Sequence, residues 1–438
     1  MRISVFGCGY LGAVHAACMA RLGHEVVGID VLEPHVAALS RGEAPFYEPG
    51  LPELLREGVE SGRLSFSTDP ATAAGSEVHF ICVGTPQKRG ENAADLRFVD
   101  AALDDLLPQL SDGDVVVGKS TVPIGTAELL TERLAAAEVG ATLIWNPEFL
   151  REGKAVEDTL HPDRFVYGLP DGESGTKAAE RLDEVYATAL AANTPKIVTD
   201  LATAQMVKVA ANSFLATKIS FINAMAELCE VAGADVTLLA DAIGLDDRIG
   251  RKFLNAGLGF GGGCLPKDIR AFMARAGELG ADQTLTFLRE VDAINMRRRV
   301  RMVDLAREEC GGSIVGRKVA LLGAAFKPES DDVRDSPALS VAAQMQLQGA
   351  DVTVTDPKAI DNAQKKWPDL RFEPTVERAV AGAELVVVLT EWQQYRELDP
   401  AVLGRLVSAR RVIDGRNCLD REAWRAAGWT YRALGRRS

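Results

Sequence analysis

The stretch Gly7-Cys8-Gly9-Tyr10-Leu11-Gly12 decides how the first part of the chain folds. Apolar, β-favouring residues at 3–6 lead into it, and small residues from 13 to about 22 follow it with helical character. A second apolar stretch then ends in Asp30, 18 residues after Gly12. This order predicts a strand–turn–helix–strand unit in which the glycines permit a tight turn and the close approach of a dinucleotide pyrophosphate.

Asp30 indicates which dinucleotide the unit prefers. A carboxylate at the end of the second strand can bind the ribose hydroxyls and repels a 2′-phosphate, so NAD is favoured over NADP. FAD binding and an ordinary tight turn remain the alternatives. The candidate cofactor-binding residues of this unit are Gly7, Gly9, Tyr10, Leu11, Gly12 and Asp30.

The pattern of the first unit continues to about residue 200. Short apolar runs at 78–83, 115–117 and 143–145 are typical of parallel strands, and helical segments lie between them. From 201 to about 232 the spacing predicts one long helix. Helical patterns continue to Arg307, interrupted by a loop at 255–266.

A second strand–turn–helix–strand unit starts at residue 316. Both 23–30 and 349–356 read as glycine, strand, and an aspartate seven residues after the glycine. The second copy lacks the glycine-rich turn and carries about ten extra residues at 326–335, so it need not bind a dinucleotide. Its Lys327 and Arg334 suit another anion. We therefore predict an α/β protein with two doubly wound Rossmann-like domains, 1–200 and 308–438, joined by a central helical segment, 201–307.

Composition excludes several classes of protein. The 438 residues contain 49 lysines and arginines against 62 acids, a net charge of −13 that argues against a broad nucleic-acid-binding surface. No apolar run reaches the roughly eighteen residues of a membrane helix, and the glycine turn comes too early for a signal peptide. Seven cysteines without a Cys-x-x-Cys pair and five scattered histidines predict a cytoplasmic protein without disulfides or a metal.

The most informative stretch is residues 257–268, in which five glycines precede Cys264. Glycines allow the backbone to approach a ligand and to adopt positive φ. Pro266 suits the first turn of a helix, which would place Cys264 at a helix N-terminus beside Lys267. The helix N-terminus and the Lys267 ammonium both favour the thiolate, so Cys264 is a candidate nucleophile. The alternative is that Cys264 is a structural cysteine. The other six cysteines are expected to be core or incidental residues.

Three further groups could complete a site. Lys208 and Asn212 share one face of the long helix and could stabilise an oxyanion, or they could be an ordinary surface lysine and a satisfied amide. Glu148 and Glu152 follow a strand and could serve as base and ligand, or simply begin a solvated helix. Residues 119–123, Lys-Ser-Thr-Val-Pro, also end a strand, where doubly wound sheets present their ligand groups.

Together these motifs resemble the UDP-glucose/GDP-mannose 6-dehydrogenase family over essentially the whole chain, most of all its UDP-glucose branch. The resemblance rests on residues 7–12, 81–86, 120–123, 146–153, 208–223, 259–268, 326–334 and 414–416. It implies a four-electron oxidation of the sugar C6 alcohol to a carboxylate by two NAD⁺ in turn.

The resemblance also implies a role for each candidate catalytic residue. Cys264 would trap the aldehyde as a thiohemiacetal, and the thioester that follows would be hydrolysed by water. Lys208 and Asn212 would stabilise the oxyanion. Glu148 would be the general base, with Thr121 and Asp268 holding or activating water.

Binding residues follow from the same resemblance. Further cofactor contacts would come from His35, Gly84, Thr85, Thr121, Glu152, Lys267 and Arg334. The nucleotide sugar would meet Glu148, Phe149, Leu150, Arg151, Glu152, Lys208, Asn212, Arg248, Phe253, Leu254, Asn255, Ala256, Gly257, Gly261, Lys327 and Arg416. Arg248 resembles an arginine contributed by the neighbouring subunit, so a homodimer built around the long helix is the expected minimum assembly.

Three positions depart from the family pattern. Leu11 replaces a common valine, His35 stands where a lysine or arginine usually helps to bind the adenosine ribose, and Gly263 replaces a larger residue before the nucleophile. Three other functions stay open. One is the same chemistry on GDP-mannose or a UDP-N-acetylhexosamine, another is a two-electron dehydrogenase that needs no cysteine, and the third is a non-catalytic NAD-binding protein.

Overall fold

The computed structural model describes residues 1–436, so the last two residues of the predicted 308–438 segment lie outside it. The chain forms two compact units. The first consists of Met1–Ala211 and Arg270–Leu279, and the second consists of Asn212–Ile269 together with the chain from Gly280 onward. Two helices, Leu201–Ala232 and Leu265–Glu278, each contribute residues to both units.

The first unit is built on an eight-stranded sheet with the order β3-β2-β1-β4-β5-β6-β7-β8. The strands are β1 Arg2–Phe6, β2 Glu25–Ile29, β3 Leu64–Ser67, β4 Val78–Ile81, β5 Val115–Gly118, β6 Thr142–Trp145, β7 Phe165–Leu169 and β8 Lys196–Asp200. Neighbouring strands are parallel except β6 and β7, which are antiparallel where Trp145 faces Gly168. The order of the first six strands is that of a dinucleotide-binding Rossmann sheet.

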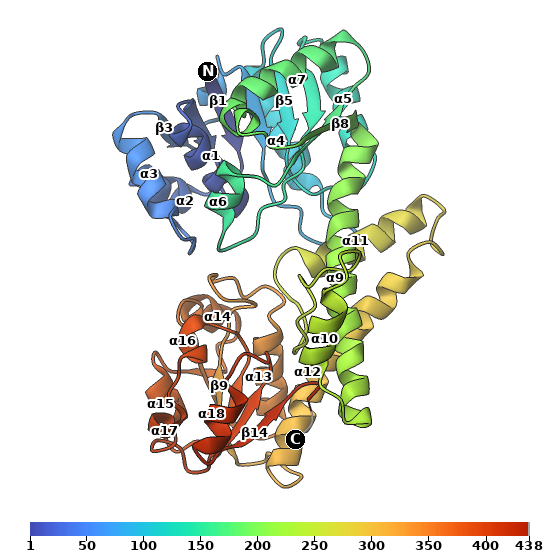
Figure 1. Cartoon of the computed structure of the whole chain (residues 1–438). Helices are drawn as coiled ribbons and strands as arrows, with labels where there is room; N and C mark the ends of the chain where they lie inside the picture. Colours follow the sequence, from blue (N-terminus) through green and yellow to red (C-terminus); the bar gives the residue numbers. More distant parts are fainter. Residues whose placement is uncertain (437–438) are drawn as a thin grey trace. The chain divides into compact units, whose positions relative to one another are not determined.

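Helices cover both faces of this sheet (Figure 1). They are α1 Tyr10–Arg21, α2 Glu33–Ser40, α3 Leu51–Glu60, α4 Arg97–Leu106, α5 Thr126–Ala136, α6 Ala155–Leu160, α7 Glu173–Val185 and α8 Ala187–Ala191, with short 3₁₀ turns at Pro70–Ala73 and Leu107–Gln109. Ile3 and Val5 of β1 belong to one buried cluster and Phe6 to another. A strand buried on both faces explains why these segments are continuous apolar runs rather than alternating patterns.

The second unit contains a six-stranded parallel sheet with the order β11-β10-β9-β12-β13-β14. Its strands are β9 Lys318–Leu322, β10 Asp351–Thr355, β11 Arg371–Phe372, β12 Leu385–Val388, β13 Arg411–Asp414 and β14 Thr430–Ala433. Its helices are α13 Pro337–Leu347, α14 Ile360–Lys366, α15 Val376–Val380, α16 Gln393–Arg396, α17 Pro400–Leu403 and α18 Arg421–Ala426. This is again a Rossmann strand order, so the prediction of two doubly wound domains is confirmed.

Four helices lie between the two sheets in sequence: α9 Leu201–Ala232, α10 Val236–Gly244, α11 Leu265–Glu278 and α12 Thr286–Glu309. The predicted long helix is confirmed as α9, which runs unbroken for 32 residues. The glycine-rich loop ends where α11 begins, directly after Cys264.

Across residues 1–436, the structure contains no helix with the length and apolar character needed to span a bilayer.

Candidate active site

The glycine turn of the first unit has the geometry that a pyrophosphate requires. Gly7 adopts φ +87°, and its amide donates to the carbonyl of Ile29 at 2.8 Å. A Cβ on Gly12 would lie 1.8 Å from the carbonyl oxygen of Gly7, whereas a Cβ on Gly9 would meet nothing within 4 Å. The open space at Gly9 lies at the start of α1, where the first backbone amides of a helix attract an anion.

Asp30 follows β2 and borders this turn. Its carboxylate accepts the amides of Cys8 at 2.7 Å and Leu32 at 2.9 Å, which leaves lone pairs on both oxygens for ribose hydroxyls. Leu11 packs on the hydrophobic core beneath the turn, and His35 lies on α2 with a buried Nδ1 that no group within residues 1–436 hydrogen-bonds. These features fit a bound dinucleotide.

Loops after β4 and β5 meet at the carboxyl edge of the same sheet. The Thr85 hydroxyl donates to the Thr121 carbonyl at 2.6 Å, and the Ser120 hydroxyl donates to the Val83 carbonyl at 2.7 Å. Gly84 is exposed, and a Cβ there would meet nothing within 4 Å. The candidate cofactor residues after these two strands are therefore held side by side.

A buried lysine anchors Glu148 after β6. Lys119, only 4% exposed, places its Nζ 3.2 Å from Glu148 Oε2, 3.0 Å from Asn146 Oδ1 and 3.2 Å from the Tyr186 hydroxyl. Burial alone would lower the pKa of the Lys119 ammonium, but the oxygens of Tyr186 and Glu148 raise that pKa above its ordinary value. The lysine therefore stays charged beside the carboxylate.

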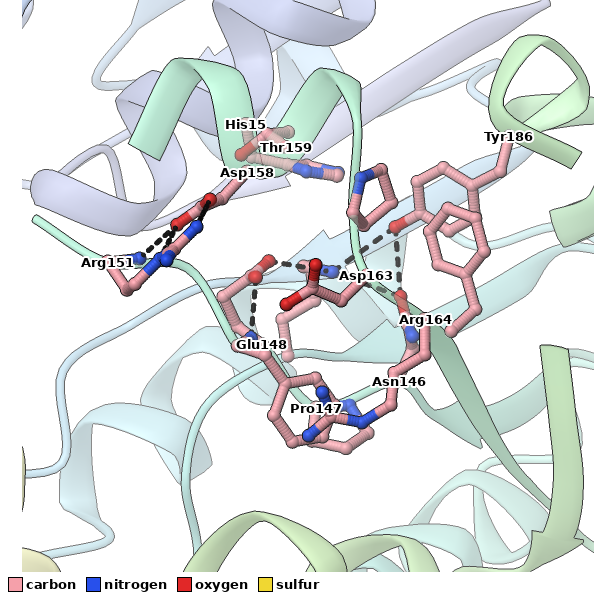
Figure 2. A pocket seen from close by; sticks show the side chains of 14 residues that line it. His15, Asn146, Pro147, Glu148, Arg151, Asp158, Thr159, Asp163, Arg164 and Tyr186 are labelled. Atoms are coloured by element: carbon pink, nitrogen blue, oxygen red, sulfur yellow. Dashed lines mark hydrogen bonds and ion pairs between the residues drawn. The ribbon is translucent and has the colours of Figure 1, made fainter. Parts of the chain in front are cut away.

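Backbone amides hold the other oxygen of the same carboxylate. Glu148 Oε1 accepts the amides of Phe149 at 2.6 Å and Leu150 at 2.8 Å. Figure 2 shows Glu148 in a pocket with Asn146 and Tyr186, whose hydroxyl donates to Asn146 Oδ1. A carboxylate fixed from both sides can orient a substrate hydroxyl or a water.

Arg151 and Arg164 line the same pocket together with Asp158 and Asp163, and Lys208 of α9 lies near its Phe149 ring. The Arg164 guanidinium lies 4.0 Å from the centroid of the Phe149 ring, and the Lys208 ammonium lies 5.4 Å from it. Arg151 donates to both oxygens of Asp158, at 2.9 Å through Nε and 2.5 Å through Nη2 (Figure 2). Lys208 of α9 and Phe149 are thus brought together, while the Arg151 guanidinium is bound to Asp158.

In the second unit, three consecutive glycines seat the loop before Cys264. A Cβ on Gly261 would lie 2.3 Å from the Asp335 carbonyl oxygen. A Cβ on Gly262, which adopts φ +84°, would lie 2.7 Å from the Phe326 ring, and one on Gly263 would lie 2.3 Å from the Arg334 guanidinium. The Gly262 amide also donates to the Arg334 carbonyl at 2.9 Å. The glycines are required because the extra loop at 326–335 packs directly on this backbone.

Cys264 is exposed and directly precedes α11. One turn into the helix, Asp268 is 2% exposed and accepts the Asn212 amide nitrogen at 2.6 Å and the Lys267 ammonium at 2.6 Å. The Asp268 amide donates to the Cys264 carbonyl at 3.0 Å. Three candidate residues predicted from the sequence thus form one network beside the cysteine.

The other six cysteines are unsuited to nucleophilic attack. Burial raises the pKa of each of them, to about 12 for Cys82. They are Cys8, Cys18, Cys82, Cys229, Cys310 and Cys418. A thiol with a raised pKa carries little thiolate at neutral pH, so Cys264 is the one exposed thiol for covalent chemistry.

The segment 253–257 approaches the cysteine loop within the second unit. Leu254 and Ala256 are buried in a small cluster, and the amide of Gly257 donates to the side chain of Asn223 at 2.8 Å. Phe253 is exposed and adopts φ +66°, a strained conformation for a bulky residue.

The nearby candidates Asn255 and Arg248 form polar contacts within their own segment of the chain. The Asn255 side chain accepts from Arg251 at 2.8 Å. Arg248 is 89% exposed at its side chain and forms a two-bond ion pair with Asp246. An arginine held outward in this way can reach another molecule more readily than the site of its own chain.

Arg416 ties three segments of the second unit together. Its guanidinium donates to the carbonyls of Leu389 at 2.8 Å, Gly259 at 3.0 Å and Phe326 at 3.3 Å. Lys327 lies with its ammonium 5.4 Å from the centroid of the Phe326 ring. Arg416 therefore supports the cysteine loop and the 326–335 loop directly, which the sequence pattern did not indicate.

Two groups of site residues escaped the sequence analysis. Asn295 and Arg299 of α12 both bond the Phe260 backbone, and the buried Glu48 bonds the backbone after Glu152. Neither group has a sequence pattern of its own, because each acts by accepting or donating to a backbone that only the folded chain brings near.

Comparison with known proteins is consistent with this geometry. Three sequence models of the UDP-glucose/GDP-mannose dehydrogenase family match the chain: its NAD binding domain over residues 1–190, its central domain over 202–297 and its UDP binding domain over 320–421. The glycine turn lies in the first of these, and NAD as the cofactor is confirmed.

Full-length relatives agree with the domain matches. UDP-glucose 6-dehydrogenase of Rhizobium meliloti is 42% identical over 441 residues and covers 100% of both chains. UDP-glucose 6-dehydrogenase TuaD of Bacillus subtilis is 41% identical and covers 99% of this chain and 93% of its own length.

Solved structures with the same fold include two dehydrogenases. A UDP-glucose dehydrogenase of Pyrobaculum islandicum superposes with a TM-score of 0.89 at 39% identity, over 99% of this chain and 98% of its own. A UDP-D-ManNAc dehydrogenase of Pyrococcus horikoshii superposes with a TM-score of 0.86 at 26% identity, over 100% and 99% of the two chains.

Proposed function

Since the chain belongs to the UDP-glucose/GDP-mannose dehydrogenase family, we propose that it oxidises the C6 alcohol of UDP-glucose to the carboxylate of UDP-glucuronate. The observation that carries this proposal is Cys264, the one exposed cysteine among seven, beside the Asn212–Asp268–Lys267 network. NAD, when bound, accepts a hydride from the sugar C6 in each of two oxidations.

Cys264 keeps the reaction from stopping at the aldehyde. Its thiolate forms a bond to the aldehyde carbon, the carbonyl electrons move to oxygen, and the resulting thiohemiacetal remains attached to the protein. Loss of a second hydride from C6 yields a thioester. Water then adds to the thioester carbon and the carbon–sulfur bond breaks, which releases the carboxylate and regenerates the thiolate. One sugar, one water and two NAD⁺ thus yield one uronate, two NADH and three protons.

Hydrogen-bond donors stabilise the oxyanion of these steps. One N–H of the Asn212 amide donates to Asp268, and the second can donate to the oxygen on C6. The Lys208 ammonium supplies a positive charge to the same oxygen. Glu148 acts as the base that receives the proton of the C6 hydroxyl, and Thr121 and Asp268 position the water.

The remaining candidates are assigned to binding. His35, Gly84, Thr85, Glu152, Lys267 and Arg334 complete the contacts to NAD, and the substrate-binding set from Glu148 to Arg416 named above holds the nucleotide sugar. In this proposal, residues 1–200 bind NAD, residues 201–307 carry the catalytic cysteine loop and the dimer contact, and residues 308–438 bind the nucleotide sugar. A reduced thiol is essential to this chemistry, so we place the protein in the cytoplasm.

Arg248 would come from a second copy of the chain. Its exposed, outward-held guanidinium supports this role, as do the exposed apolar residues Phe214, Phe221 and Leu228 along α9. We therefore propose a homodimer formed through α9 as the active assembly.

The test counts NADH at the end point. The protein is incubated with excess NAD⁺ and limiting UDP-glucose, GDP-mannose or UDP-N-acetylglucosamine in separate reactions. Two NADH per UDP-glucose with a uronate product are expected. One NADH with released aldehyde would contradict the thioester route, and turnover of another sugar alone would move the substrate to that sugar.

Variants separate the covalent route from simple alcohol oxidation. Cys264→Ala should abolish acid formation, whereas the matched control Cys310→Ala, at a buried cysteine after α12, should retain it. Acid formation by Cys264→Ala at the wild-type rate would refute the role of the thiol.

A further inference from the structure

Glu48 is a buried carboxylate that the reaction does not use. It lies between α2 and α3 and is 2% exposed. Its Oε2 accepts the Tyr10 hydroxyl and the Gly153 amide at 2.6 Å, and its Oε1 accepts the Ala155 amide at 2.7 Å. All three donors are neutral, so this carboxylate is held by hydrogen bonds rather than by an ion pair.

Burying a carboxylate at this position costs free energy. Removing a carboxylate from water costs free energy that only well-placed donors offset, and an apolar residue would fill the same volume without that cost. The carboxylate links two separate segments of the chain, because it accepts hydrogen bonds from both of them at once. Those segments are the start of α1 and the chain that follows Glu152.

Tyr10 places one end of this connection in the cofactor turn. It is the first residue of α1, directly after Gly9, and its ring lies 4.7 Å from the ring of Phe46. Burial and the hydrogen bond to Glu48 raise the pKa of Tyr10 well above its ordinary value, so the phenol keeps its proton and remains a donor.

Gly153 places the other end next to the sugar-binding segment. Its amide donates both to Glu48 and to the Tyr10 hydroxyl, at 2.6 and 3.0 Å, in a backbone conformation with φ +78°. Ala155, the other partner of Glu48, is the first residue of α6. Residues 148–152 are thus fixed at one end by Lys119 and at the other by Glu48.

We propose that the Tyr10–Glu48–Gly153 connection couples the NAD site to the sugar-binding segment 148–152, so that a bound dinucleotide raises the affinity for the nucleotide sugar. The inference rests on the proposed function for the identity of the ligands. A pyrophosphate at the first turn of α1 restrains Tyr10, and the hydrogen bonds pass that restraint to Gly153. Tyr10 and Glu48 act as positioning residues in this respect. By linkage, the nucleotide sugar must raise the affinity for the dinucleotide by the same factor.

Calorimetry with a non-reacting pair of ligands tests the coupling. The dissociation constant of UDP-glucose is measured without and with saturating NADH, which permits no turnover. NADH should tighten UDP-glucose binding to the wild-type protein at least about fivefold, the low end of typical couplings. In Tyr10→Phe, which leaves both backbone bonds of Glu48 in place, and in Glu48→Gln, the factor should fall below two.

Asp114→Asn is the matched control. Asp114 is also a buried carboxylate that accepts a backbone amide, from Ser111 at 2.7 Å, but it directly precedes β5 and so lies at the amino ends of the strands rather than at their carboxyl ends. It should keep the wild-type factor. Hydrogen exchange provides an independent measure: NADH should slow amide exchange across 148–156 in the wild type and leave it unchanged in Tyr10→Phe.

The outcomes separate this inference from the proposed function. A wild-type factor near one, or a wild-type factor retained in Tyr10→Phe, would overturn the coupling. Failure of UDP-glucose to bind in either state would instead refute the proposed substrate. The same ratio would then be measured with GDP-mannose and UDP-N-acetylglucosamine, and a factor near one for the sugar that binds would overturn the coupling as well.

Discussion

Cys264 differs from the other cysteines of the chain in what surrounds its sulfur. It is exposed at the start of a helix, whereas burial raises the pKa of the remaining six thiols. Each unit by which a pKa rises above the pH lowers the thiolate fraction about tenfold. The sequence already singled out Cys264, because five glycines and a helix start surround it, but exposure is visible only in the fold.

Brief treatment of the native protein with iodoacetamide at neutral pH should therefore alkylate Cys264 first. Peptide mass spectrometry should find one carboxamidomethyl group per chain, with Cys82 and Cys418 modified only after denaturation. UDP-glucose added beforehand should protect Cys264 if the thiol lies at the sugar site. Equal labelling of Cys82 or Cys418 in the native protein would contradict the assignment of Cys264 as the reactive thiol.

Gly262 of the cysteine loop combines a positive φ with a close steric contact, so it tolerates a side chain poorly. Its φ of +84° is strained for any other residue, and a Cβ would meet the Phe326 ring at 2.7 Å. We expect Gly262→Ala to lower the free energy of unfolding by about 1–3 kcal/mol. It should also reduce kcat strongly, because the loop that carries Cys264 must move away from the Phe326 ring. Urea unfolding and initial rates would measure both effects.

Gly277 offers a matched comparison for this substitution. It lies within α11, and a Cβ there would meet nothing within 4 Å. Gly277→Ala should leave the rate unchanged and stabilise the protein by up to about 1 kcal/mol, because alanine loses less backbone entropy in a helix. Equal losses in the two variants would show that the cysteine loop has no special need for glycine.

At the scale of elements, the Lys119–Glu148 pair joins the carboxyl ends of β5 and β6. The ammonium is buried and the carboxylate side chain is 18% exposed. Lys119→Met should cost about 3 kcal/mol of unfolding free energy, because it leaves a largely buried carboxylate without its cation. Urea denaturation of the variant would measure this loss.

A double-mutant cycle distinguishes pairing from packing. If Lys119 stabilises the fold through Glu148, Lys119→Met in the Glu148→Gln background should cost at least about 1 kcal/mol less than in the wild type. Strictly additive losses would mean that Lys119 acts through Asn146 and Tyr186 instead. Lys119→Arg is expected to recover only part of the stability, since a planar guanidinium cannot occupy the position of a compact ammonium.

Elements were predictable wherever a repeating pattern marked them. The strands β1, β2, β4, β5, β6, β9 and β10, the helix after Cys264 and the whole of α9 follow from apolar runs and glycine positions, whereas the short strands β3, β8 and β11 to β14 were not predicted. The antiparallel step at β7 was not predictable, because strand direction depends on the path of the chain between strands. Glu48 was missed for a related reason, since its partners are backbone amides about a hundred residues away.

The aspartate that ends the second strand has a different structural role in each copy of the strand–turn–helix–strand unit. In the second copy, Asp356 is buried and accepts the amides of Ala324 and Ala325 and the indole nitrogen of Trp392. Asp30 of the first copy remains partly exposed. Asp356 thus holds the turn of the second copy through hydrogen bonds to its backbone. This explains why the second copy does not need the glycine-rich pattern.

For the whole molecule, the sequence predicted two Rossmann-like sheets joined by a helical segment, but not how the site residues divide between compact units. Glu148, Thr121 and Lys208 lie in the first unit, whereas Asn212 and the Cys264 network lie in the second. Lys208 and Asn212 are adjacent on one face of α9, yet compactness places them in different units.

The exposed face of α9 carries the prediction for the assembly. Phe214, Phe221 and Leu228 follow one another at seven-residue spacing and are 66%, 48% and 60% exposed. Large apolar side chains in such a row are stabilised when a second helix covers them. If the proposed dimer forms through this row, Phe221→Asp should yield monomers in analytical ultracentrifugation. It should also lower kcat/KM, because the proposal assigns Arg248 to the site of the second copy.

Leu347→Asp controls for the effect of introducing a negative charge at an exposed apolar position. Leu347 ends α13 and is 87% exposed, so it is at least as accessible as Phe221 but lies outside the α9 row. This variant should sediment as the wild type does and keep its activity. A monomeric wild-type protein with full activity would refute both the dimer and the role of Arg248, whereas a Phe221→Asp dimer would show that another surface holds the two copies together.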